Sequence, residues 1–153
     1  MTVSHDDGVI VLGSGEGRPH RSPVGDVLLW KAGEEATGGA YSLHERSVTP
    51  GTTSLPHIHH ELVEAFFVLE GAFEFTVGGR TIAGLPGTFV LVPRGVAHGW
   101  TAGGGGPARA LVLFTPSARR EFFEKLDDLA QSAGPGGVDP ATLLELSREY
   151  GWA

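Results

Sequence analysis

Short apolar and alternating runs, separated by turns, fill the chain between residues 24 and 116. Glycine or proline bounds most of these runs, which is typical of strands rather than helices. The predicted strands cover residues 24–31, 39–48, 55–59, 63–70, 72–77, 80–82, 88–92, 96–101 and 108–115. Gly78-Gly79 lies between two of them and predicts a two-residue hairpin turn, because such turns need positive φ. Strands at this spacing fit a barrel or jelly roll, which closes its own sheet edges.

The period of the apolar positions becomes helical after Pro116. Thr115-Pro116 is expected to cap and begin a first helix, which the glycines in 134–137 end. A second helix is expected from Asp139-Pro140 to Gly151. We expect both helices to pack outside the barrel. The pattern also allows them to cover its mouth or to face a partner subunit.

The sequence divides into three parts. Residues 1–23 form a polar, turn-rich N-terminal segment with one apolar run at 8–12. The glycines in 13–17 lack the Lys-Ser/Thr ending of a phosphate-binding loop, so an ordinary loop is predicted there. Residues 24–116 form the barrel and residues 117–153 the helical extension. No internal repeat is visible, so the predicted all-β fold is a single barrel rather than a tandem one.

Composition and charge exclude several classes of function. With 153 residues the chain is expected to form one domain with a real core. Its net charge of −7 argues against a nucleic-acid partner bound through phosphates. The absence of cysteine excludes disulfides, thiolate metal sites and cysteine nucleophiles. Neither a signal peptide nor a membrane span is visible, so we expect a cytoplasmic protein with no membrane partner.

Three histidines and a glutamate stand at spacings that suit a metal site. His57 and His59 should point to the same side of an extended strand, because strand side chains alternate. Glu64 opens the next apolar run, so a turn would bring its carboxylate to the two imidazoles, and His98 is a fourth candidate. Three imidazole nitrogens and a carboxylate oxygen suit one divalent transition metal: iron, nickel, manganese, cobalt, copper or zinc.

These residues stand in a pattern that resembles the first motif of the cupin superfamily. Gly51, five residues, His57-x-His59, four residues, Glu64, six residues and Gly71 match that motif at every position. The resemblance implies a double-stranded β-helix, or jelly-roll, barrel in a small single-domain metal-binding cupin.

The second cupin motif is matched in most of its positions. Gly87, five residues, Pro93-x-Gly95, two residues and His98 agree with it, whereas Ala102 stands where the family has asparagine. That asparagine is not a metal ligand in the family. The resemblance therefore still implies His57, His59, Glu64 and His98 as metal ligands.

Strand alternation also predicts the walls of a pocket. If Glu64 points inward, so do Phe66 and Val68, and Trp100 accompanies His98. We take Phe66 and Trp100 as candidate substrate-pocket residues, with simple core packing as the alternative. An apolar, aromatic pocket favours a planar or aliphatic organic substrate. His60 should face away from His59, and the histidines outside the motifs are expected to be solvated: His5, His20 and His44.

The layout, helices included, is similar to that of bacterial quercetinase-like cupins. The resemblance implies a metal-dependent dioxygenase that acts on a small hydroxy-ketone or aromatic substrate, with Glu64 as the catalytic base. A non-oxidative enzyme such as a polyketide cyclase-like cupin remains an alternative, as does a module that binds a small ligand without chemistry. Cupins often dimerise through edge strands, which implies a homodimer.

Overall fold

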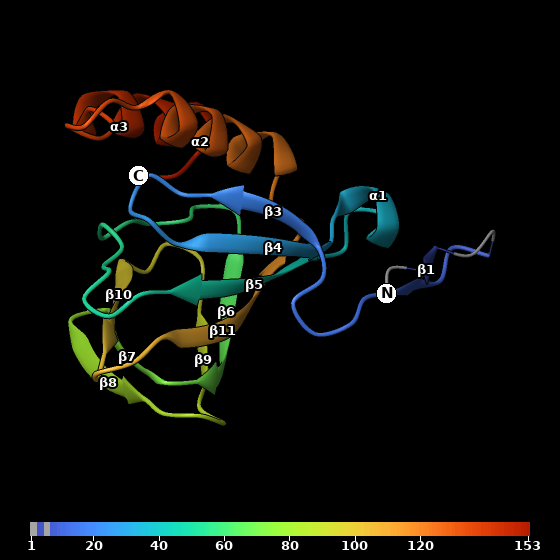
Figure 1. Ribbon diagram of the computed structural model, residues 1–153, viewed down its shortest axis with the longest axis horizontal. Coiled ribbons are helices and arrows are strands. Elements are labelled where there is room, and N and C mark those ends of the chain that lie inside the picture. Colours follow the sequence, from blue (N-terminus) through green and yellow to red (C-terminus); the bar gives the residue numbers. More distant parts are fainter. Residues whose placement is uncertain (1–2, 5–6) are drawn as a thin grey trace.

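Two antiparallel sheets form the barrel in the computed structural model, which describes residues 3–4 and 7–153 (Figure 1). The larger sheet has the strand order β3 (Arg18–Arg21), β4 (Val27–Ala32), β5 (Ser42–Val48), β11 (Ala108–Thr115), β6 (Val63–Glu70) and β9 (Phe89–Val92). The smaller sheet has the order β10 (His98–Gly103), β7 (Ala72–Val77) and β8 (Arg80–Gly84). This arrangement confirms the predicted jelly-roll barrel with C-terminal helices. The predicted Gly78-Gly79 turn joins β7 to β8, with both glycines at positive φ.

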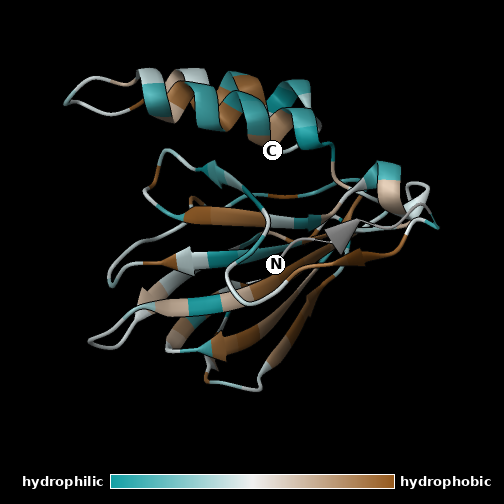
Figure 2. Cartoon of the chain, turned by 45° about the vertical axis from the view of Figure 1, so that its right-hand side comes forward, coloured by the Kyte–Doolittle hydropathy of each residue, from teal (hydrophilic) through white to brown (hydrophobic). Residues whose placement is uncertain are grey.

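The core lies between the two sheets, where inward positions alternate with outward ones along each strand. In β11 the even-numbered residues, Ala108 to Phe114, are buried and the odd-numbered ones are half-buried. The largest buried apolar residues are Leu28, Trp30, Phe66, Phe73, Phe75, Trp100, Phe114, Phe122 and Phe123. Each such side chain contributes about 1.5–3 kcal/mol to stability by leaving water. Hydrophobic stretches run along several strands of the barrel in Figure 2.

Three helices accompany the strands in the described part of the chain: α1 (Glu34–Thr37), α2 (Arg120–Ser132) and α3 (Pro140–Glu149). The sequence did not predict α1, a single turn that ends at Gly38 in the left-handed conformation. As predicted, Asp139 caps α3 by accepting a hydrogen bond from the Thr142 amide. None of the described helices is both long and apolar enough to cross a membrane.

The first C-terminal helix begins later than predicted, at Arg120 rather than at Pro116. The preceding amides are engaged elsewhere, because Ser117 N donates to Gly39 O at 2.9 Å and Ala118 N to Ser42 Oγ at 3.0 Å. These bonds tie the segment to the start of β5. The chain therefore becomes helical only after this segment. In Figure 1, α2 and α3 lie together above β3.

The N-terminal residues contain strands that the apolar pattern did not indicate. β1 (Val3–Ser4) and β2 (Ile10–Val11) form a small hairpin outside the two barrel sheets (Figure 1), and Ile10 lines a hollow together with Lys31 and Ala32 of β4. β3 pairs with β4 and forms one edge of the six-stranded sheet. Its sequence, Arg-Pro-His-Arg, has no apolar alternation, because only His20 of this strand is buried.

Candidate metal centre and adjoining pocket

An extended segment, residues 53–59, carries the first two predicted ligands. Its residues 55–59 were expected to be a strand, but the segment makes only isolated bridges: Thr53 with Thr101, His57 with His98 and His59 with Trp152. Pro56 interrupts the ladder because it has no backbone N–H to donate. The bridge to His98 has bonds in both directions, at 2.9 and 3.0 Å, and it places His57 opposite His98.

The other two predicted ligands come from opposite sheets. Glu64 is an inward-facing residue near the start of β6, and His98 is the first residue of β10. A corner at Pro93-Arg94-Gly95 brings the chain back to the segment, where Gly95 N donates to His59 O at 2.8 Å. The two motifs therefore meet between the sheets.

The four side chains converge on one point. Glu64 Oε2 lies 2.9 Å from His59 Nε2, 2.7 Å from His98 Nε2 and 3.8 Å from His57 Nε2. One ligand atom from each residue lies within 4.8 Å of all the others. Glu64, His59 and His98 are buried, whereas His57 is partly exposed on the side of the adjoining pocket.

Backbone carbonyls fix which imidazole nitrogens face the cluster. His57 Nδ1 donates to Leu55 O at 2.8 Å, and His98 Nδ1 donates to Val96 O at 2.9 Å. A carbonyl oxygen can only accept, so Nδ1 carries the proton and Nε2 points toward Glu64. This is the arrangement by which metal-ligating histidines are usually oriented.

The ionisation of the cluster suits a cation. Burial alone would raise the pKa of Glu64, but its close contacts with the rings of His57, His59 and His98 outweigh burial and hold that pKa well below its usual range. Burial lowers the pKa of His59, whereas contact with Glu64 overcomes burial at His98 and raises its pKa. The carboxylate is therefore ionised at neutral pH.

The donor atoms fit a bound metal ion on physical grounds. A carboxylate oxygen and neutral Nε2 atoms are all acceptors, so at these distances their lone pairs repel unless a cation or a proton lies among them. Three imidazole nitrogens and one carboxylate oxygen are ligands that divalent transition metals accept. The sequence-predicted residues His57, His59, Glu64 and His98 are thus brought together in a cluster that could hold a metal ion.

A cavity of about 150 Å³ adjoins the cluster. His57 and Glu64 form part of its wall, and the rest is mainly apolar. Its other lining residues are Ser22, Pro23, Val24, Leu28, Arg46, Ser54, Leu55, Trp100, Phe114, Phe122, Phe123, Leu126, Leu143, Ser147 and Trp152. Of the two predicted pocket residues, Trp100 lines this cavity, whereas Phe66 packs in the core with its ring centroid 5.0 Å from that of Phe75.

Trp152, which no motif of the sequence marks, covers the candidate metal centre. Its ring centroid lies 4.3 Å from that of His59 and 4.0 Å from that of Phe122 of α2. Backbone hydrogen bonds in both directions between Ile58 and Ala153 hold it in place. The helical extension therefore brings Trp152 over the barrel mouth, one of the arrangements that the sequence left open. Only the apolar character of Trp152 could have suggested this.

Arg46 was also not identified from the sequence as a residue of the cavity. It lies two residues after the buried His44 on β5, and therefore on the same face of that strand. Arg46 and Trp100 both line the cavity. The sequence pattern of β5 places polar residues on both faces, so parity alone did not reveal which face is inward.

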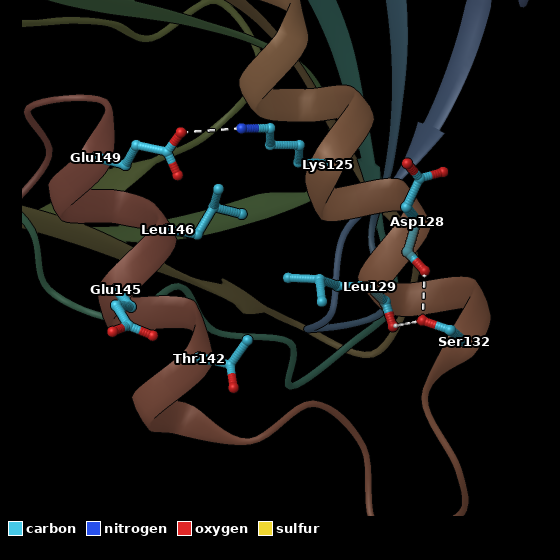
Figure 3. Close-up of a pocket in the computed structure, with 8 residues that line it drawn as sticks. All are labelled: Lys125, Asp128, Leu129, Ser132, Thr142, Glu145, Leu146 and Glu149. Carbon is cyan, nitrogen blue, oxygen red and sulfur yellow. Dashed lines mark hydrogen bonds and ion pairs between the residues drawn. The ribbon is translucent and has the colours of Figure 1, made fainter.

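A second hollow lies between the two C-terminal helices (Figure 3). It has a volume of about 420 Å³, and Figure 3 shows Leu129 and Leu146 facing each other across it. An ion pair of 3.0 Å between Lys125 and Glu149 borders it. The residues that line this cleft include none of the four cluster residues, so it is separate from the candidate metal centre.

Two histidines outside the motifs were expected to be solvated, and this prediction is wrong. His20 and His44 are buried, with exposed fractions of 2% and 0%. His44 stacks on Trp30 at a centroid distance of 5.8 Å, and the His20 ring meets the edge of Trp30 at 6.1 Å. His5 lies outside the described residues. His60 is exposed, as the alternation predicted.

The fold and the cluster define a jelly-roll protein with a candidate metal centre, and comparisons with known proteins identify its family. Residues 44–114 match the model of the cupin domain. Together with the many similar solved structures, this match shows that the chain belongs to the cupin superfamily. No curated protein matches the chain.

Three solved structures illustrate the similarity. The polyketide cyclase RemF from Streptomyces resistomycificus is 26% identical, with a TM-score of 0.61, covering 70% of this chain and 79% of RemF. An RmlC-like cupin from Shewanella frigidimarina is 16% identical, with a TM-score of 0.64 and coverage of 78% and 97%. KdgF from Halomonas sp. is 21% identical, with a TM-score of 0.57 and coverage of 63% and 83%. The last two likenesses show the fold alone.

Proposed function

We propose that the protein is a metal-dependent cupin enzyme, a quercetinase-like dioxygenase that acts on a small hydroxy-ketone or aromatic substrate. The observation that carries this proposal is the convergence of three imidazoles and one carboxylate beside an apolar, aromatic cavity. Redox and Lewis-acid chemistry is what a divalent transition metal supplies when it is bound by such ligands.

The chain's own residues have distinct roles in this proposal. His57, His59, Glu64 and His98 hold the metal. Glu64 would also accept the proton of the substrate hydroxyl at a carboxylate oxygen. The apolar wall of the cavity excludes water and binds the flat face of the substrate against Trp100 and Phe114.

Dependence on oxygen tests this function. The metal-loaded protein is incubated with quercetin and with a single-ring 3-hydroxy-4-pyranone, in air and without oxygen, and substrate loss and oxygen uptake are followed. We expect one oxygen molecule consumed for each substrate converted, and no conversion by His98→Ala. The cavity of about 150 Å³ favours the single-ring compound. Equal conversion without oxygen would reject the dioxygenase.

A non-oxidative metal-dependent cyclase is the second candidate. The observation that favours it is the likeness to the polyketide cyclase RemF, which has the highest identity of the three structures described. Oxygen-independent rearrangement of a test substrate, lost in His98→Ala, would support this alternative. A small-molecule binding protein without chemistry would return every bound compound unchanged.

We also propose a homodimer that buries the β9 edge of the six-stranded sheet. Phe89 and Leu91 of this edge strand are 61% and 51% exposed, and the neighbouring Phe67 of β6 is 42% exposed. An uncovered strand edge with outward apolar side chains is the kind of surface that pairs with another chain. A second copy would cover these residues.

A further inference from the structure

Arg46 is a cationic side chain in the wall of an otherwise largely apolar cavity. Its Nη1 lies 2.6 Å from Asp26 Oδ2, and the Asp26 side chain is fully buried while that of Arg46 is 13% exposed. The guanidinium carbon lies 4.9 Å from the centroid of the Trp100 ring. Asp26 and Trp100 therefore hold the guanidinium in a fixed orientation beside the cavity.

The hydrogen bonds of Arg46 are not all satisfied within the described residues. A guanidinium has five N–H donors, and the Asp26 carboxylate accepts from Nη1. The Nε atom of Arg46 is buried and has no hydrogen-bond partner among the described residues. That atom is closed to solvent, so a ligand oxygen in the cavity would bind to Nη2, whose N–H groups also have no acceptor among the described residues.

The serines of the cavity wall are uncharged and each makes a hydrogen bond within the protein. Ser54 Oγ accepts from Trp100 N at 2.9 Å, Ser147 Oγ donates to Leu143 O at 2.8 Å, and Ser22 Oγ accepts from Val24 N at 3.2 Å. Glu64 is committed to the three histidines. Arg46 is thus the fixed positive charge that this wall offers to a ligand.

The size and shape of the cavity limit the rest of the ligand. A volume of about 150 Å³ matches an apolar cavity that holds one benzene ring. Trp100, Phe114 and Trp152 supply aromatic surfaces for a flat ring.

We propose that the substrate is a single-ring aromatic acid whose carboxylate binds Arg46 while its ring lies in the aromatic cavity beside the histidine cluster. This inference rests on the proposed function and deepens it by naming the class of substrate. Arg46 acts here as a specificity-determining residue, because a planar guanidinium pairs with a carboxylate through two parallel hydrogen bonds.

A pair of probes that differ only in the acid tests this assignment. The metal-loaded protein is titrated with 4-hydroxybenzoate and with neutral 4-hydroxybenzyl alcohol, and binding is measured by calorimetry and by tryptophan fluorescence. We expect the dissociation constant of the acid to be at least tenfold lower than that of the alcohol.

The test variant removes both charges of the Asp26–Arg46 ion pair, so that neither is left buried without its partner. Arg46→Met alone would leave Asp26 buried and unpaired, so the test variant is Asp26→Asn/Arg46→Met, checked for folding by circular dichroism. We expect this variant to bind the acid and the alcohol equally. Arg46→Lys should retain part of the preference, because it keeps the charge but loses the fork. Arg80→Met, which removes an exposed arginine of β8, should retain the full preference.

The His98→Ala variant shows whether a preference for the acid comes from Arg46 or from the candidate metal centre. If the double variant still prefers the acid while His98→Ala does not, the metal centre binds the carboxylate and the inference is overturned. An Arg46-dependent preference that persists in His98→Ala supports it. Arg46-dependent binding without oxygen uptake would reject the dioxygenase and leave the assignment of Arg46 intact. Oxygen-dependent turnover with no role for Arg46 would support the dioxygenase and overturn the assignment of Arg46.

Discussion

The burial of His44 shows how strand alternation can override the usual preference of histidine for the surface. Both of its ring nitrogens are buried without a partner among the described residues, and its ring lies between Trp30, Phe114 and Phe123. Burial, and secondarily the Arg46 charge, holds the pKa of His44 well below its ordinary value. The side chain is therefore a neutral, stacked ring at physiological pH, and folding opposes its protonation.

This residue should make the protein less stable in mild acid. The unfolded state binds a proton at His44 near pH 6.5, whereas the folded state does not, so its contribution to stability is complete above pH 6.5 and is lost as the pH falls. We expect the stability of the wild type relative to His44→Phe to fall between pH 6.5 and 5 by up to about 1.4 kcal/mol per pH unit. Urea unfolding at several pH values measures this difference. A difference that does not change with pH would contradict the neutral, buried state.

The residues of the candidate metal centre were predictable because their spacing is fixed in two motifs. The spacing and its resemblance to the two cupin motifs point to His57, His59, Glu64 and His98, and the structure brings their ligand atoms within 4.8 Å of one another. Arg46 and Trp152 were not predictable, since their places depend on which face of β5 is inward and on where the last helix ends. These are consequences of packing between distant elements.

At the scale of elements, the glycines of the first motif fall into two physical kinds. Gly51 and Gly71 both have positive φ, at 81° and 72°, so any other residue is strained there. A Cβ at Gly51 would meet no atom within 4 Å, whereas at Gly71 it would lie 2.4 Å from Pro107 O. Gly71 is therefore required for the close passage of the chain beside β11 as well as for its own turn.

We predict that the two alanine variants differ in stability. Gly51→Ala should destabilise the protein by about 1–2 kcal/mol, the cost of a left-handed conformation. Gly71→Ala should cost about 1–3 kcal/mol more, because backbone atoms must also move apart. The midpoints of urea unfolding for the two variants measure this difference. Equal destabilisation would show that close approach at Gly71 has no cost.

The apolar periodicity predicted most elements of the barrel and both C-terminal helices, but it failed where hydrogen bonds rather than apolar side chains decide the structure. The segment containing His57 and His59 is extended without being a regular strand, because Pro56 has no N–H. The start of α2 is displaced by the bonds from Ser117 to Gly39 and from Ala118 to Ser42 of β5. β3 has no apolar pattern because its buried side chain is His20.

At the scale of the whole molecule, the C-terminal helical extension contributes to both the core and the wall of the cavity. Phe122 and Phe123 of α2 are buried and line the cavity, and the segment after α3 places Trp152 against His59. Trp152 and His59 also line another cavity, of about 230 Å³. The proposed substrate site therefore depends on both the barrel and its extension.

The proposed dimer is tested at the same scale. Phe89→Lys/Leu91→Lys places two charges on the β9 edge, and we expect it to convert a dimer into a monomer in light scattering after size-exclusion chromatography. Leu144→Lys is the matched control, because Leu144 is 45% exposed on α3, away from that edge. A wild type that is monomeric at all concentrations, or a dimer that survives the double substitution, would contradict the proposal.

The metal content of the protein shows whether the four converging side chains hold a metal ion. Plasma mass spectrometry of the purified protein, and of protein incubated with each candidate metal and then desalted, gives the number of ions per chain. We predict about one divalent transition-metal ion per wild-type chain and loss of that ion in His98→Ala, with circular dichroism showing that the variant is folded. A folded wild-type protein that retains no metal, or a His98→Ala variant that retains as much as the wild type, would contradict the account.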